Sequence, residues 1–386
     1  MKTRRNIKGL TLHELREFVD SIGEKPYRAR QLFRWMYGRG AQSFEEMTDL
    51  SKPLRTALEQ AALVRNLESS MQRQSMQDGT AKFLFRLSDG LQIESVLIPP
   101  DKTSPGAEKR LTLCVSTQVG CPLDCAFCAT GTMGFHRNLT PGEIVDQVLQ
   151  AQRFSPRRIT NLVYMGMGEP MLNYENVMKS VEIISDAHGL TIGPKRITIS
   201  TAGYADKIRR LADERQSIKL AVSLHSLDDE KRSLLMPINK KFPIRSLVES
   251  LEYYYRAVRR RPTLEYIVFD EFNNTTDDVH RLVDLSRRFP FKVNLIPFHP
   301  IGFADPAGIG ARLRGASPAA IEEFAGALRA RKMTVMVRSS SGEDIEAACG
   351  QLVVQESSTR VGRKHRTPAG RFLGQIPATF NHSSKL

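Results

Sequence analysis

Cysteine is scarce in this sequence, and long apolar runs are absent. Five cysteines occur in 386 residues, and a small, odd number in a chain of this size argues against a framework of disulfide bonds. No run of about twenty apolar residues is present, so no membrane-spanning helix is predicted. The first residues, MKTRRNIKGL, carry charge without an apolar stretch behind them, which does not fit a secretory signal peptide. We therefore expect a globular protein of the cytoplasm.

Acidic residues are outnumbered by basic ones. The chain has 56 lysines and arginines against 42 aspartates and glutamates, which gives a formal net charge of +14. The basic residues are spread over many segments instead of one tail, and this favours a polyanionic partner such as a nucleic acid. A basic soluble enzyme without such a partner is the simpler alternative. The length suffices for two domains, or for one large barrel with an appendage.

Helical periodicity covers about residues 11–66. One face of this region combines basic and aromatic side chains. It fits either an RNA contact or a solvated helix face with aromatic residues packed beneath it. The residues of this face, here called the basic stripe, are Lys25, Tyr27, Arg28, Arg30, Arg34, Trp35, Tyr37 and Arg39.

Strand patterns follow the helical region. In GTAKFLFRLSDGLQIESVLIPP, two β-rich runs flank Ser88-Asp89-Gly90, and Asp-Gly between such runs predicts a hairpin. From about residue 108 to 337, apolar strand-like runs alternate with amphipathic helical ones, which is typical of a parallel sheet, either doubly wound or a complete or open barrel. The strand-like runs are RLTLCVS, ITNLVYMG, RITIST, IKLAVSLH, TLEYIVFD, KVNLIPF and MTVMVR. Residues 354–386 are polar, basic and aperiodic, and predict a disordered tail.

Three of the five cysteines lie close together in GCPLDCAFCATG, as Cys121, Cys125 and Cys128. A structural zinc site closes with four protein ligands, and no second CxxC pair or paired histidines follow here. Ferredoxin clusters also use four thiolates. Three thiolates therefore favour a [4Fe-4S] cluster with one open iron, which the amino and carboxylate groups of S-adenosylmethionine can bind. In this respect the sequence resembles the radical S-adenosylmethionine enzymes.

Polar residues follow several predicted strands, at the end where α/β barrels place their active sites. LVYMGMGEP ends a strand with Gly166, Gly168 and Glu169. The glycines allow the backbone to approach a ligand closely, and Glu169 can accept hydrogen bonds from an ammonium group. Further polar residues at strand ends, each of which also fits an ordinary capping role, are Ser200, Ser223, His225 and Asn294.

Cys349 lies far from the other cysteines, in SGEDIEAACGQL. Cys349 is either a small buried residue near a helix end or part of a loop that folds over the barrel rim. QVGCPLDCAFCATG, YMGMGEP, SLH and DIEAACGQL in this order resemble the radical S-adenosylmethionine RNA adenine methyltransferases, which modify carbon 2 of adenine in 23S ribosomal RNA and certain tRNAs. The resemblance implies a helical RNA-binding accessory domain at 1–70, a β-hairpin linker at 71–105 and an open (β/α)6 partial barrel at 106–353. It leaves only the tail at 354–386 unexplained.

The resemblance also implies roles for individual residues. Cys121, Cys125 and Cys128 would hold the [4Fe-4S] cluster. Cys349 would carry a methyl group, with Cys114 as its resolving partner. Glu94, in QIESVLIP, matches the position of a proton acceptor. The residues implied to contact S-adenosylmethionine are Gly168, Glu169, Ser200, Ser223, Leu224, His225 and Asn294.

The route implied by this family uses two molecules of S-adenosylmethionine, because carbon 2 of adenine is not nucleophilic. One methylates the Cys349 thiolate, and the other yields a 5′-deoxyadenosyl radical that removes a hydrogen from the S-methyl group. The carbon radical adds to adenine, a base removes the ring proton, and attack by Cys114 on Cys349 releases the product with a transient disulfide. The implied partners are 23S rRNA, tRNA and an electron donor such as flavodoxin or ferredoxin, and the implied state is a monomer.

Two positions differ from many relatives. Ser341 stands where a basic residue is common, and His299 where an asparagine often precedes the proline. Two other functions remain open. One is methylation of carbon 8 of adenine by the same route, which confers antibiotic resistance. The other is a non-enzymatic iron-sulfur RNA-binding protein that senses redox state.

Overall fold

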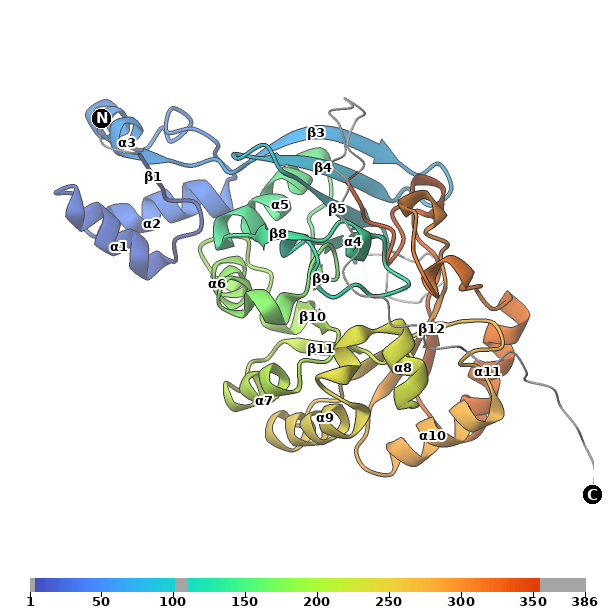
Figure 1. The fold of residues 1–386 in the computed structure, drawn as a ribbon. Coiled ribbons are helices and arrows are strands. Elements are labelled where there is room, and N and C mark those ends of the chain that lie inside the picture. The colour runs from blue at the N-terminus through green and yellow to red at the C-terminus, as the bar shows by residue number, and fades with distance from the viewer. Residues whose placement is uncertain (1–3, 101–109, 355–386) are drawn as a thin grey trace, which may run out of the picture. The chain divides into compact units, whose positions relative to one another are not determined.

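A single sheet of ten strands organises the fold, in the order β14-β13-β12-β11-β10-β9-β6-β5-β4-β3 (Figure 1). The computed structural model describes residues 4–100 and 110–354. The predicted tail, apart from Val354, and the last residues of the predicted linker lie outside the described residues. Within those residues, no helix has both the length and the apolar character needed to cross a membrane.

Seven strands of the sheet run parallel and alternate with helices, as the apolar runs predicted. The strands are β6 (Thr112–Cys114), β9 (Asn161–Tyr164), β10 (Ile197–Thr201), β11 (Lys219–Ser223), β12 (Thr263–Val268), β13 (Lys292–Pro297) and the short β14 (Val335–Val337). The helices are α5 (Pro141–Phe154), α6 (Tyr174–Ser185), α7 (Ala205–Asp213), α8 (Asp229–Leu235), α9 (Ile244–Val258), α10 (Thr276–Ser286) and α11 (Pro318–Ala330). Because β14 and β3 lie at opposite edges and do not pair, the sheet is open.

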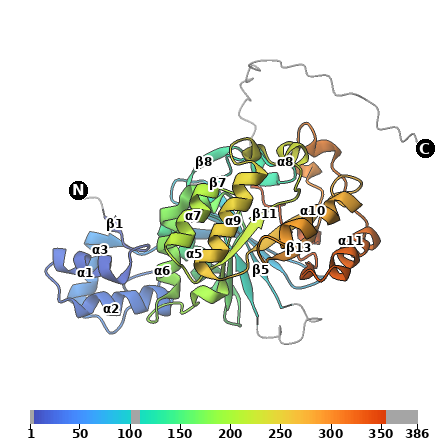
Figure 2. The ribbon, with the colours of Figure 1, turned by 90° about the horizontal axis from the view of Figure 1, so that it is seen from below.

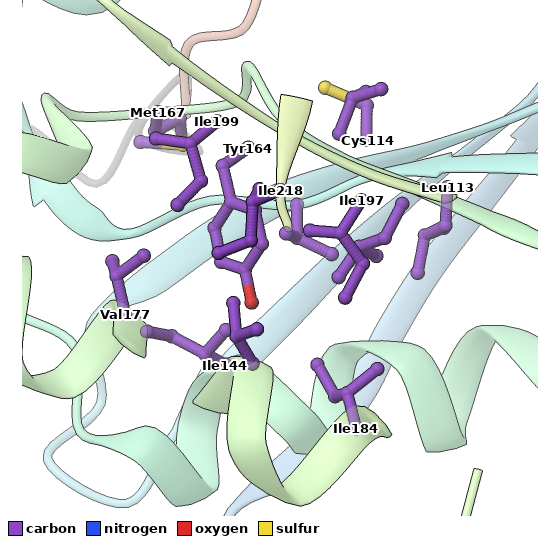
Figure 3. Close-up of a cluster of buried hydrophobic side chains, with 14 of the residues drawn as sticks. Leu113, Cys114, Ile144, Tyr164, Met167, Val177, Ile184, Ile197, Ile199 and Ile218 are labelled. Carbon is purple, nitrogen blue, oxygen red and sulfur yellow. The ribbon is translucent and has the colours of Figure 1, made fainter. Parts of the chain in front are cut away.

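The helices cover the outer face of the parallel strands (Figures 1 and 2). In Figure 3, Ile144 of α5 and Ile184 of α6 pack beneath Tyr164 and Ile197 of the sheet, and all four side chains are buried. Cys114 lies apart from these side chains in the same view. The alternation of a strand explains this, since neighbours along a strand point to opposite faces. Cys114 therefore belongs to the inner face of the sheet.

The predicted hairpin forms and extends the same sheet. It consists of β4 (Ala81–Leu87) and β5 (Gln92–Ile98), and β5 pairs antiparallel with β6. Gly90 adopts a φ of +85° in the turn, and its N–H donates to the Leu87 carbonyl at 3.0 Å. A third antiparallel strand, β3 (Leu67–Gln74), lies at the edge and was not predicted. Its side chains are exposed beyond the first residue, so the sequence LESSMQRQ lacks the apolar alternation that marks a strand.

The amino-terminal region is helical, as predicted. It contains α1 (Leu12–Ser21), α2 (Tyr27–Phe33), a π-helix (Arg34–Gly38) and α3 (Lys52–Ala61), with the two-residue strands β1 (Arg5–Asn6) and β2 (Ala62–Leu63). The basic stripe is not uniform. Tyr27 is 53% exposed, but Tyr37 is fully buried, and its hydroxyl accepts a hydrogen bond from Gly9 N and donates one to Leu10 O. Tyr37 is therefore a core residue.

A buried ion pair attaches this region to α5. Lys8 Nζ lies 2.9 Å from Asp146 Oδ1, and both side chains are fully buried. The other carboxylate oxygen of Asp146 accepts hydrogen bonds from the backbone N–H groups of Asn66 and Leu67, at 3.1 and 3.0 Å. One carboxylate thus binds the chain both before and after the amino-terminal helices.

Candidate active site

The inner face of the parallel sheet carries the polar residues that were predicted at strand ends. The pairing register places Ser223 of β11 beside Glu265 of β12, and Glu265 beside Asn294 of β13. Asn294 Nδ2 donates to Glu265 Oε2 at 2.7 Å. Ser223 and Asn294 are half-buried, whereas their helix-facing neighbours Val222 and Val293 are fully buried. A row of polar groups therefore lines the inner face, with Ser223 and Asn294 partly exposed, and the buried Glu265 is a member that was not predicted.

The three clustered cysteines lie on the loop between β7 (Gln118–Gly120) and α4 (Ala129–Thr132), and β7 pairs with β8 (Phe135–Asn138). The loop begins at Gly120, where a Cβ atom would lie only 1.8 Å from the Gly134 carbonyl oxygen. Cys121 N–H donates to that carbonyl at 2.8 Å. The thiols influence one another, because burial and the neighbouring Cys128 raise the pKa of Cys121 to about 12.

The Gly-Glu-Pro turn after β9 lies beside this loop. Both glycines permit close packing of the chain on itself, because a Cβ on Gly168 would lie 2.5 Å from Gln118 Cβ and one on Gly166 would lie 2.7 Å from the Val115 backbone. The Glu169 carboxylate accepts hydrogen bonds from Met171 N at 3.0 Å and Ala202 N at 2.8 Å. Burial raises the pKa of Glu169 to about 7. The turn is thus anchored to the end of β10.

His225, just after β11, presents an unpaired donor. Its Nδ1 accepts a hydrogen bond from Ile267 N at 3.0 Å, so the proton of the neutral imidazole lies on Nε2. That nitrogen is buried and has no partner among residues 4–100 and 110–354. The Phe127 ring meets the imidazole edge to face, with 4.6 Å between the centroids. Burial and the charge of Arg232 lower the pKa of His225 to about 3, which keeps the ring neutral.

The segment that carries Cys349, residues 342–354, is here called the Cys349 segment. It lies against the cysteine loop, since Ala129 N–H donates to the Gly350 carbonyl at 2.7 Å and Thr130 Oγ1 to the Leu352 carbonyl at 2.6 Å. Cys349 also interacts electrostatically with Cys114. Burial, and then the charge of Cys349, raise the pKa of Cys114 to about 12, while Arg338 opposes this shift. The chain therefore brings together Cys114, Cys349 and the cluster loop.

Comparisons with known proteins agree with this geometry. The family model of the ribosomal RNA large subunit methyltransferase N-terminal domain matches residues 5–64, and that of the radical SAM superfamily matches residues 115–285. The dual-specificity RNA methyltransferase RlmN of Geobacter sulfurreducens is 46% identical over 352 residues, which cover 91% of this chain and 93% of the relative. The protein of the same name from Anaeromyxobacter sp. strain Fw109-5 is 42% identical over 384 residues, which cover 97% and 96%. The chain belongs to the RlmN family.

The solved structures support the same fold. A radical SAM methyltransferase from Sphaerobacter thermophilus superimposes with a TM-score of 0.83 at 42% identity, over 90% of this chain and 99% of that one. The expected fold class, an open α/β partial barrel with an amino-terminal helical region, is confirmed, as is the expected class of enzyme, a radical S-adenosylmethionine methyltransferase.

Membership in the RlmN family implies S-adenosylmethionine and an iron-sulfur cluster, and the residues present fit both. The described residues contain no group of three His, Cys, Asp or Glu side chains placed to hold one metal ion. A cluster makes a different demand, because each of its cysteines binds a different iron. Cys121, Cys125 and Cys128 supply the soft thiolate donors that iron-sulfur clusters require. The unpaired Nε2–H of His225 and the polar inner face fit a polar ligand beside them.

An arginine that was not predicted from the sequence connects the carboxyl ends of β10 and β11. Arg232 on α8 is 1% exposed, and its guanidinium donates to the carbonyls of Ala202 at 2.7 Å and of Leu224 and Ser223 at 3.1 Å. It ties the ends of β10 and β11 to each other, and its charge acts on Cys125. Nothing in the sequence DEKRSLL marks this arginine, because all these partners, and the Asn239 side chain to which it also donates at 2.7 Å, lie outside α8.

Proposed function

We propose that this enzyme methylates carbon 2 of a specific adenine in 23S ribosomal RNA and in tRNA, with Cys349 as the methyl carrier. The observation that carries the proposal is the meeting of Cys349, Cys114 and the three-cysteine loop at one end of the barrel. The proposal includes two molecules of S-adenosylmethionine for each methyl group transferred. A [4Fe-4S] cluster held by Cys121, Cys125 and Cys128, with S-adenosylmethionine at the residues assigned from the family, would supply the radical chemistry and the methyl group.

The chain's own residues have distinct proposed roles. The Cys349 thiolate accepts the methyl group, and its sulfur later links the protein to the base. Glu94 removes the proton from the methylated ring carbon. Cys114 then attacks the sulfur of Cys349, so that an S–S bond forms as the bond between that sulfur and the methyl-derived carbon breaks. The methyl-derived carbon leaves with the bonding electron pair, which the adenine ring delocalises, and takes up a proton to complete the methyl group. An external thiol or electron donor must then reduce the disulfide, since both cysteines are free thiols in the structure.

The wider assignment follows from the same proposal. Residues 1–70 act as an RNA-binding accessory domain, residues 71–105 as a linker and residues 106–353 as the catalytic barrel. The target adenine is unpaired or flipped out, because a base within a helix cannot reach a partly buried cysteine. The proposed partners are 23S rRNA, tRNA and a flavodoxin- or ferredoxin-like electron donor, and the proposed state is a cytoplasmic monomer.

Nucleoside analysis tests this proposal. The reconstituted enzyme and a Cys349→Ala variant are incubated anaerobically with reductant, S-adenosylmethionine and unmodified rRNA, and the nucleosides are identified by mass spectrometry against synthetic standards. We expect 2-methyladenosine from the wild type alone. Formation of 8-methyladenosine would move the assignment to the carbon-8 enzyme. Absence of any methyladenosine from a preparation with an intact cluster would return it to the RNA-binding redox sensor.

A further inference from the structure

The Cys349 segment has little regular secondary structure, and hydrogen bonds from other elements hold it in place. A single 3-10 turn, Glu343–Ile345, is its only helix or strand within the described residues. Gly342 N–H donates to Asp78 Oδ2 at 2.9 Å, and the contacts from Ala129 and Thr130 hold residues 350–352. The position of Cys349 therefore depends on hydrogen bonds with elements that are distant in the sequence.

Lys82 on β4 makes two contacts that are unusual for a lysine. Its Nζ lies 2.9 Å from Glu94 Oε1, and the two side chains are only 8% and 7% exposed. The same Nζ donates to the backbone carbonyl of Glu346 at 3.0 Å. Lysine is rarely buried unless it is paired. Here one ammonium group joins β5 to the residues just before Cys349.

Glu94 completes the arrangement on the other side of Cys349. Its second oxygen, Oε2, accepts a hydrogen bond from Val353 N–H at 3.0 Å. The pairing register places Lys82 opposite Val96 and Leu84 opposite Glu94, so the lysine and the glutamate are diagonal neighbours on one face of the hairpin. Lys82 and Glu94 thus bind Glu346 and Val353, on either side of Cys349.

A purely structural role explains this pair poorly. Taking two charges out of water is expensive, and a buried ion pair can often be replaced by apolar residues without loss of stability. The hairpin already has an apolar core in which Phe83 and Phe85 are fully buried. The charged pair instead fixes the position of the Cys349 segment, because its donor and acceptor atoms bind two specific backbone groups of that segment.

We infer that Lys82 is a positioning residue, which clamps the Cys349 segment onto the hairpin through Glu346 and, by way of Glu94, through Val353. Two consequences follow. Loss of Lys82 frees the segment, so that Cys349 no longer keeps one position. It also leaves Glu94 without its closest positive charge. The second consequence bears on proton removal and so rests on the proposed function, whereas the first does not.

The charges that face Glu94 determine how the second consequence appears. They are Lys82 on β4 and Arg73 on β3. Burial raises the pKa of Glu94, and these two charges lower it by a smaller amount, so that the pKa stays above its ordinary value. Without Lys82 the pKa of Glu94 rises again. A carboxylate that accepts a proton must be ionised, so the acid limb of product formation moves to higher pH in a Lys82→Met variant.

Hydrogen exchange of the reconstituted holoenzyme measures the clamp directly. In Lys82→Met, we expect amides within residues 343–354 to exchange at least tenfold faster than in the wild type, with no change in the peptides of β10 and β11. Arg86→Met is the matched control, because Arg86 lies on the same strand but is exposed. It should exchange like the wild type. Lys82→Arg keeps the charge and should restore part of the protection.

The pH profile of methyladenosine formation separates positioning from general stability. We expect the acid limb of Lys82→Met to move upward by about one pH unit or more, and that of Arg86→Met to coincide with the wild type. Unchanged exchange in residues 343–354 would overturn the clamp. A lower rate with an unshifted acid limb would overturn the link to Glu94. If the wild type forms no methyladenosine, the proposed function fails, but the exchange result still decides the clamp.

A second variant covers the case in which Lys82→Met does not fold. The double variant Lys82→Met/Glu94→Leu leaves no unpaired buried charge, which is the main reason a single change would unfold the hairpin. We expect it to show the same rapid exchange in the Cys349 segment. Wild-type protection in this folded double variant would contradict the inference.

Discussion

At the scale of single residues, Cys114 offers the sharpest test of the proposed chemistry. If Cys114 resolves the link between Cys349 and the base, then Cys114→Ala should still form that link but not break it. We expect a covalent complex of protein and RNA that survives denaturing electrophoresis and disappears after nuclease digestion. The double variant Cys114→Ala/Cys349→Ala is the control and should form no complex. Free methylated product from Cys114→Ala at the wild-type rate would exclude this role.

Arg338 affects the same step through charge. Its positive charge lowers the pKa of Cys114, which burial raises to about 12, and the attacking species is the thiolate. Replacing Arg338 with methionine therefore raises the pKa of Cys114 and reduces its ionised fraction at neutral pH. We expect the covalent complex to persist longer in Arg338→Met, with decay slower than in the wild type by a similar factor at each pH, because the pKa of Cys114 lies above the measured pH range in both proteins. Time courses of complex decay between pH 7 and 9 measure this, and equal decay in both proteins would contradict it.

At the scale of secondary structure, the buried pair between Lys8 and Asp146 holds the amino-terminal helices on α5. Asp146→Ala leaves the Lys8 ammonium buried without a partner and removes the acceptor for the N–H groups of Asn66 and Leu67. We expect it to lower the free energy of unfolding by about 3–5 kcal/mol, measured by urea denaturation. Lys179→Met is the control, since the pair of Lys179 with Glu14 joins α6 to α1 but is partly exposed, and its loss should cost about 1 kcal/mol or less. Similar losses from both variants would refute this account.

The elements show how far sequence patterns reach. The seven parallel strands were predicted because their helix-facing residues are apolar, whereas β3 was missed because almost all its side chains face solvent. The three-cysteine loop was predicted from its spacing alone. By contrast, Lys82, Arg232, Glu265 and Arg338 owe their surroundings to contacts between elements that are distant in the sequence. No local pattern distinguishes a charged residue inside the fold from an exposed one, so the surroundings of these four residues could be identified only from the structure.

At the scale of the whole molecule, the net charge of +14 leads us to expect RNA binding that weakens as salt rises. The basic stripe contributes two arginines to a hollow that Arg34, Arg39 and His188 line together. The π-helix brings these two arginines to the same hollow. Its hydrogen bond from Arg39 N to Arg34 O closes a wider turn than that of an α-helix, and so places the two residues on one side of the helix. The Arg39 guanidinium also lies over the Trp35 ring, 4.1 Å from its centroid.

If each of these arginines binds one phosphate of the substrate RNA, then Arg34→Gln/Arg39→Gln should reduce the slope of log K against log salt by about 1.5 to 2. Fluorescence anisotropy with labelled, unmodified tRNA at several salt concentrations measures that slope. The matched control is Arg245→Gln/Arg287→Gln, which removes the same net charge from exposed arginines already paired with Glu249 and Asp284. A local phosphate contact predicts a change in the first variant alone. Equal changes in both would mean that the overall charge attracts the RNA and that the hollow has no special part.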